Sequence, residues 1–103
     1  MKLDLLAFAA HPDDTELSCA GTLASHVSMG MNVGVIDFTR GEMGTRGTAE
    51  IRDQEAKKSA EILGLAIREN LGFEDAFFED DRHHQLEIIK KIRKYRPDII
   101  LAN

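Results

Sequence analysis

The sequence has little cysteine, proline and basic charge. Its 103 residues include one cysteine, two prolines and no tryptophan. A single cysteine excludes an internal disulfide and is typical of a reducing compartment. The 13 Lys and Arg residues are outnumbered by 18 Asp and Glu, which gives a formal charge of −5. The basic stripe that binds a nucleic-acid backbone is therefore missing, and we expect no nucleic-acid partner.

A long apolar run is also missing. The start, MKLDLLAFAAH, resembles a secretion signal only superficially, because Asp4 interrupts it and residues 5–10 are too short for a signal core or a membrane span. We therefore expect a cytoplasmic protein that does not enter a membrane.

The apolar pattern predicts alternating strands and helices. Short apolar runs predict strands at 3–10, 32–38, 67–73 and 98–102, and helical spacing predicts helices at 17–29, 48–63 and 82–95. On the last helix we expect Leu86, Ile89, Ile92 and Tyr95 to face the core. This alternation favours one α/β domain, a Rossmann-like three-layer sandwich whose parallel sheet has the strand order 3-2-1-4, with the third strand at an edge.

The last predicted strand reads DIILA, which is the pattern of a strand buried on both faces. No later helix or strand is present to cover it. We therefore expect residues 1–103 to be the N-terminal part of a single domain, truncated after its fourth strand. A homo-oligomer contact, or a chain that carries the missing C-terminal part, would cover the apolar surface.

Three ionisable side chains crowd together after the first predicted strand, at His11, Asp13 and Asp14. Pro12 restricts His11 to extended backbone geometry, and the two acids fall where a helix N-terminus favours negative charge. A helix cap would explain one acid, but not the adjacent pair and the histidine. An imidazole and a carboxylate suit Zn²⁺, and a second carboxylate suits a general base. The predicted strand order places this cluster beside the crevice where the winding reverses.

The cluster belongs to a longer pattern. AHPDD at 10–14 is followed by Glu16, by GTL at 21–23, by DFTRGEMGT at 37–45 and by RDQEA at 52–56. With these motifs the chain resembles the LmbE-like (PIG-L) zinc-dependent N-acetylglucosaminyl deacetylases. Within that family it is most similar to the bacillithiol-biosynthesis deacetylases, which act on N-acetylglucosaminyl malate. The resemblance covers nearly the whole chain, but only the N-terminal part of the family domain.

The resemblance implies a role for four residues. His11 and Asp14 would be Zn²⁺ ligands, Asp13 the general base that acts on the attacking water, and Arg52 a substrate-binding residue. The implied partner is a small molecule, and the implied reaction is the hydrolytic removal of acetate from an N-acetylglucosaminyl conjugate. Family members supply a third zinc ligand and an oxyanion-stabilising histidine from a His-x-x-His segment after the fourth strand, which this sequence does not contain. The isolated chain is therefore expected to be inactive or nearly so.

Two other functions stay open. A receiver-like signalling module also gathers carboxylates after its first parallel strand, but it holds Mg²⁺, which prefers oxygen ligands and is disfavoured by His11. A non-catalytic fragment that needs a partner chain is the other alternative. His83 and His84 are weak replacements for the missing ligand, because adjacent residues at a helix start point to different sides.

Overall fold

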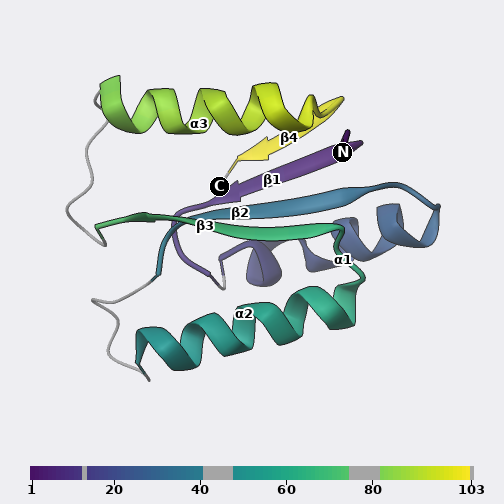
Figure 1. Ribbon diagram of the computed structural model, residues 1–103. Coiled ribbons are helices and arrows are strands. Elements are labelled where there is room, and N and C mark those ends of the chain that lie inside the picture. The colour runs from purple at the N-terminus through teal and green to yellow at the C-terminus, as the bar shows by residue number, and fades with distance from the viewer. Residues whose placement is uncertain (13, 41–47, 75–81, 103) are drawn as a thin grey trace.

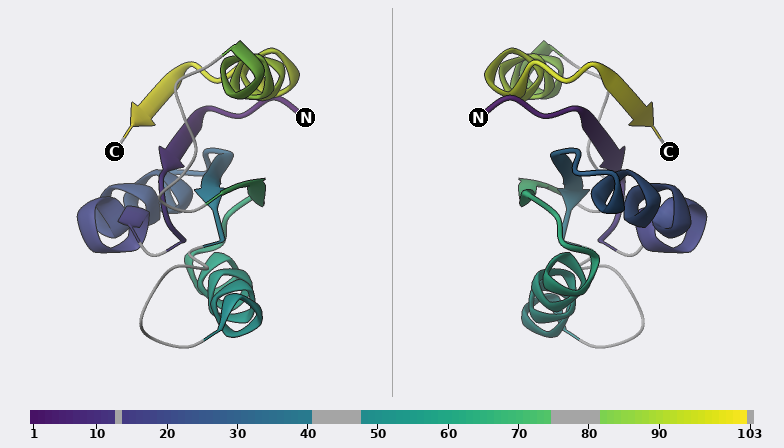
Figure 2. Two further views of the ribbon diagram at one scale, coloured as in Figure 1. Left: turned by 90° about the vertical axis from the view of Figure 1, so that its left-hand side faces the viewer. Right: turned by 90° about the vertical axis from the view of Figure 1, so that its right-hand side faces the viewer.

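The structure is a computed structural model that describes residues 1–12, 14–40, 48–74 and 82–102. Four parallel strands form one sheet in the order β3-β2-β1-β4. Helix α3 covers one face, and α1 and α2 cover the other (Figures 1 and 2). The bounds are β1 Leu5–Ala9, α1 Asp14–Ser28, β2 Val33–Thr39, α2 Ala49–Leu63, β3 Ile67–Phe73, α3 Arg82–Tyr95 and β4 Ile99–Ala102. The predicted three-layer architecture and strand order are confirmed, including the edge position of β3.

The central strand β1 is buried on both faces. Leu6 and Phe8 belong to the core cluster under α3, while Leu5 and Ala7 belong to the cluster on the α1 side. Successive side chains of a strand point to opposite faces, so this one strand contributes to both cores. The short apolar run in the sequence has the composition that such a position requires. Within the described part of the chain, no helix is both long enough and apolar enough to cross a membrane.

Helix α3 presents a different face to the sheet from the one predicted. Leu86 and Ile89 were expected to lie inward, but they are 44% and 41% exposed. Ile92 packs against the core and Tyr95 is buried, as predicted, but Ile88 packs there in place of Leu86 and Ile89. The apolar residues of this helix occupy more than one face, so their spacing alone did not determine its rotation about its axis.

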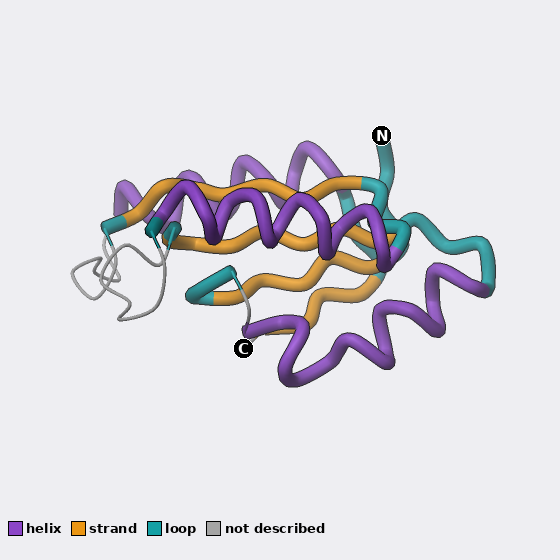
Figure 3. Tube along the Cα trace, turned by 90° about the horizontal axis from the view of Figure 1, so that it is seen from below, coloured by secondary structure: helices purple, strands orange, loops and turns teal. Residues whose placement is uncertain are grey.

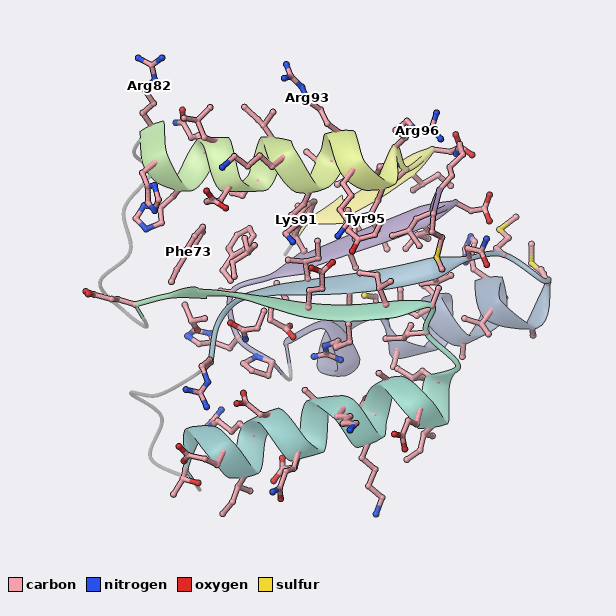
Figure 4. All side chains as sticks on the ribbon, in the orientation of Figure 1. Phe73, Arg82, Lys91, Arg93, Tyr95 and Arg96 are labelled. Atoms are coloured by element: carbon pink, nitrogen blue, oxygen red, sulfur yellow. The ribbon has the colours of Figure 1, made fainter. Side chains whose placement is uncertain are left out.

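Polar contacts with β3 explain the rotation of α3. Glu69 accepts hydrogen bonds from Lys91 Nζ, at 2.7 Å, and from the Tyr95 hydroxyl. Figure 4 shows Lys91 and Tyr95 directed toward the sheet, whereas Arg82 and Arg93 point away from it. Lys91 and Tyr95 lie one helical turn apart, and their contacts orient α3 so that Ile88 and Ile92 face the sheet. Leu86 and Ile89 are left facing solvent.

The Glu69–Tyr95 contact predicts how stability changes at high pH. Burial raises the pKa of Glu69, but the hydrogen bonds from Lys91 and Tyr95 outweigh it, and the pKa lies below its ordinary value. Burial and the hydrogen bond to Glu69 raise the pKa of Tyr95 to about 12 from 10.0. Because the folded state holds this proton more tightly than the unfolded state, the stabilisation is complete below pH 10 and is lost toward pH 12.

We therefore expect the free energy of unfolding to fall more steeply over that pH interval in the wild type than in Tyr95→Phe. Urea denaturation at several alkaline pH values measures this. All other ionisable groups are common to both proteins, so the difference between the two curves isolates Tyr95. Parallel curves would contradict the expectation.

Strand β4 lies at the open edge of the sheet and is only partly covered. Among the described strands it pairs with β1 alone, and Ile99 and Ile100 are each 45% exposed. These neighbouring residues point to opposite faces of the sheet, so apolar surface is open on both. The sequence predicted an apolar strand that needs further cover, and the structure contains that strand. An exposed apolar edge strand can pair with another chain.

Self-association of this chain is expected to depend on β4. Replacing Ile99 and Ile100 together with threonine keeps the β-branched shape but removes apolar surface. We expect the double variant to stay monomeric at concentrations where the wild type associates, as measured by sedimentation velocity. Ile62→Thr is the control, because Ile62 is 77% exposed but lies on helix α2. Equal effects of the two changes would rule out an edge-strand contact.

Candidate active site

His11 lies on the turn that joins β1 to α1. The strand ends at Ala9, and the helix begins at Asp14, three residues earlier than the predicted start of 17. The carbonyl oxygen of Ala10, just before His11, accepts hydrogen bonds from Thr39 N at 3.1 Å and from Thr39 Oγ1 at 2.9 Å. The end of β2 thus holds in place the Ala10 carbonyl, which directly precedes the half-buried His11.

The backbone just after His11 is held by a residue of β3. Arg68 Nη2 donates a hydrogen bond to the carbonyl oxygen of Pro12. Arg68 Nε donates to Asp37 Oδ2 at 2.8 Å, and the two side chains of this ion pair are only 7% and 2% exposed. The carbonyl groups on either side of His11 are therefore fixed by side chains from two neighbouring strands.

A further bond joins the two strands at this end of the sheet. Asn70 Nδ2 donates to the carbonyl oxygen of Thr39 at 2.6 Å, and Asn70 Oδ1 accepts from Gly72 N at 2.8 Å. Thr39 in turn bonds Ala10, so the contacts run from β3 through β2 to the turn after β1. The carboxyl ends of these three strands form one connected polar frame.

Arg52 comes from another element, helix α2. The side chain of Thr48 caps this helix by accepting from Ile51 N at 3.2 Å. The next residue after Arg52, Asp53, accepts from Arg40 Nη2 at 2.6 Å and from Arg40 Nε at 3.0 Å. Both partners are more than 40% exposed, so this ion pair contributes at most about 1 kcal/mol to stability. Its main effect is to connect Arg40, the residue after β2, to the first half of α2.

A cavity of about 590 Å³ lies between α2 and the sheet. Figure 3 shows the backbone of α2 crossing in front of the strands on this side of the sheet. Among its lining residues are Pro12 from the His11 turn, the ion-paired Asp37 and Arg68, and Asp53 from α2. Ala56, Ala60 and Ile67 add apolar surface to the lining. Further polar groups come from α2 and β3, at Lys57, Glu61, Glu69 and Asn70. Within the described lining neither His11 nor Arg52 appears, but the residue next to each of them does. The turn and the helix that carry the two predicted site residues thus border one cavity.

The proposed metal ligands are only partly described. Asp13 lies outside the described residues, and Asp14 is described only as the first residue of α1. Within the described ranges, no group of three or more His, Cys, Asp or Glu residues is arranged to hold a metal ion. The donor types at this turn, one imidazole and two carboxylates, do fit zinc. The predicted roles of His11, Asp13, Asp14 and Arg52 stay predictions.

His83 and His84 lie at the start of α3, which covers the opposite face of the sheet from α1 (Figure 1). The His84 ring packs edge-on against Phe73 at the end of β3, with ring centroids 4.3 Å apart. The two imidazoles contact each other with centroids 5.4 Å apart. His84 therefore packs against the end of β3, and the prediction that neither imidazole replaces a missing ligand stays a prediction.

The polar frame around His11 was not predicted. Asp37 and Thr39 belong to the motif that carries the resemblance, but no role followed for them. Arg68 and Asn70 lie in a strand for which only an edge position was predicted. The available signal was a lone acid within the apolar run of β2 and a lone base in β3. Val35 pairs with Arg68 and Asp37 with Asn70, so the ion pair is diagonal across two strands.

Comparison with known proteins identifies the family. The family model PIG-L, GlcNAc-PI de-N-acetylase, matches residues 6–103. A mycothiol S-conjugate amidase from Streptomyces coelicolor is 34% identical over an alignment of 128 positions. The alignment covers 96% of this chain and 43% of that protein. A diacetylchitobiose deacetylase from Thermococcus kodakarensis is 36% identical over an alignment of 104 positions, which covers 94% of this chain and 39% of that protein.

A solved structure agrees with these matches. The conserved protein TT1542 from Thermus thermophilus is 46% identical and superposes with a TM-score of 0.89, covering 95% of this chain and 44% of that chain. This chain thus spans less than half the length of these three proteins. The match over residues 6–103 does not favour the receiver-like alternative. This chain belongs to the PIG-L, GlcNAc-PI de-N-acetylase, family.

Proposed function

We propose that this chain is part of a zinc-dependent deacetylase that hydrolyses the acetamide of an N-acetylglucosaminyl conjugate. The observation that supports it most directly is the frame around His11. Thr39 and Arg68 hold the carbonyl groups on either side of this residue, at the carboxyl end of β1. The chain is related to enzymes named as an amidase and a deacetylase, which supports a catalytic role for this turn.

Each of the four site residues has a distinct part in the proposal. His11 and Asp14 would hold zinc, and a bound zinc ion supplies Lewis-acid activation of water and of the acetamide carbonyl. Asp13 accepts a proton from the attacking water and passes a proton to the departing nitrogen. The carbonyl carbon gains the water oxygen and its bond to nitrogen breaks, which yields acetate and a free amine. Arg52 binds the sugar conjugate from α2.

The proposed substrate class is an N-acetylglucosaminyl conjugate, and the finer proposal is N-acetylglucosaminyl malate. Motif resemblance to the bacillithiol-biosynthesis deacetylases supports the malate conjugate. The names of the two relatives suggest other aglycones, a second sugar or a mycothiol conjugate. A location in the cytoplasm, a homo-oligomer and completion by a C-terminal part of the domain stay predictions.

The test uses the chain extended by the C-terminal part that the family domain carries. Amine release is measured with N-acetylglucosaminyl malate, diacetylchitobiose and a mycothiol S-conjugate, before and after chelation and again after zinc is restored. We expect release to stop on chelation and to return with zinc, and kcat/KM to be highest for the malate conjugate. Release that ignores chelation, or no release from any of the three, would contradict the proposed function. A higher kcat/KM for another conjugate would contradict only the choice of malate.

A further inference from the structure

We infer that Arg68 is a positioning residue that fixes the orientation of His11 through the Pro12 carbonyl. The inference rests on the proposed function only in taking His11 to be a metal ligand. Arg68 lies on β3, which is two strands away from β1 in the sheet. Its side chain nevertheless reaches the turn after β1, and both ends of the contact are described.

The geometry of Arg68 suits a bridge. Nε donates to Asp37 Oδ2 at 2.8 Å, and Nη2 donates to the Pro12 carbonyl. A guanidinium is planar and carries its donors in fixed directions, so orienting one bond orients the other. The side chain is 7% exposed, and the buried charge is offset by Asp37. The ion pair with Asp37 therefore fixes the Arg68 guanidinium, which in turn donates to the Pro12 carbonyl.

The turn depends on such side chains because the strand pairing ends before it. The registered pairs of β1 run to Ala9 with β2 and to Phe8 with β4. Beyond that point Thr39 bonds the Ala10 carbonyl, and Arg68 bonds the Pro12 carbonyl. His11 lies between the two. Loss of either bond gives the peptide groups around His11 freedom to rotate, which moves the imidazole relative to the acids that follow it.

Arg68→Lys is the sharpest variant. A lysine keeps the charge opposite Asp37, but its ammonium is a single point and cannot span both acceptors as the guanidinium does. Glu69→Gln is the matched control, because Glu69 is the next residue of β3 and contacts Lys91 and Tyr95 of α3. The control weakens β3 packing without touching the turn.

Backbone order of the turn is the first measurement, made by ¹⁵N relaxation on the full 103-residue chain. In the wild type and in Glu69→Gln we expect order parameters of about 0.85 at Ala10 and His11. In Arg68→Lys we expect them to fall below about 0.6 while those of the β2 core stay unchanged. Unchanged order in Arg68→Lys would overturn the inference.

Zinc affinity is the second measurement, made on the chain extended by the C-terminal part of the family domain, by competition with a chromophoric chelator. We expect Arg68→Lys to bind zinc about tenfold more weakly, because residues that orient a ligand affect affinity on that scale. Glu69→Gln should match the wild type. Equal affinity of Arg68→Lys and the wild type, together with unchanged order, would assign Arg68 a purely structural role.

The two measurements separate the inference from the proposed function. If His11→Ala does not weaken zinc binding, the zinc site fails, while a loss of order in Arg68→Lys still supports positioning by Arg68. If Arg68→Lys does not fold, the pair Arg68→Gln with Asp37→Asn replaces it, because this double variant leaves no buried unpaired charge. The same loss of order at Ala10 and His11 is then expected, and retained order overturns the inference.

Discussion

Replacing Asp37 with alanine is expected to lower the free energy of unfolding by about 3–5 kcal/mol. Asp37 is 1% exposed and accepts from Arg68, whose side chain is 7% exposed. Removing the carboxylate leaves a buried guanidinium without the charge that offsets its desolvation. The loss should exceed the value of the ion pair itself, because the isolated charge cannot reach water without disturbing β3.

Urea denaturation measures this loss, and a second ion pair provides the control. Asp53→Ala breaks the contact with Arg40, whose partners are 42% and 43% exposed, and should cost no more than about 1 kcal/mol. The double change Asp37→Leu with Arg68→Met should recover most of the stability, because it removes both buried charges at similar volume. Similar losses of stability from Asp37→Ala and Asp53→Ala would show that burial does not determine how much these ion pairs contribute to the free energy of unfolding.

Asp13→Asn is expected to lower kcat of the completed enzyme by about 10²–10⁴-fold with little change in KM. Asparagine keeps the shape of the side chain but cannot accept the proton that the attacking water must lose. Because the predicted role of Asp13 is proton transfer and not ligation, the zinc content should stay at the wild-type level. Asp14→Asn should instead lose zinc and activity together.

Steady-state amine release and elemental analysis of the same preparations test this division of roles. Asp98→Asn is the control, because Asp98 pairs with Lys2 on the surface and the exposed pair contributes little. If Asp13→Asn loses zinc in proportion to activity, Asp13 is a ligand and the assignment of the two acids must be exchanged. If Asp13→Asn keeps full activity, the base is another residue.

The sequence predicted the sheet well because each strand has a simple local signal. The apolar run of β1, the β-branched run of β2 and the polar character of β3 correspond to central, inner and edge positions. The side-chain alternation of a buried strand is a short-range property, so a single sequence can reveal it. The His11 turn was also predicted, because its position follows directly from the end of β1.

The rotation of α3 and the frame around His11 were missed for one shared reason. Both depend on polar pairs that join distant residues, Glu69 with Lys91 and Asp37 with Arg68, which are 22 and 31 positions apart. Periodicity describes residues within one element and contains no information on such partners. A charged residue inside an apolar strand is the signal to follow, because burying it requires an opposite charge nearby.

The alternation of side chains along β1 has a consequence beyond packing. Leu6 and Phe8 face one core and Leu5 and Ala7 the other, so sliding the strand by one residue would exchange both sets and bury the wrong sizes on each side. The same slide would carry His11 about 3.3 Å along the sheet and turn it to the opposite face. Four ordinary apolar side chains thereby determine where the imidazole lies, and a one-residue insertion before Ala10 would displace it even if every polar partner were kept.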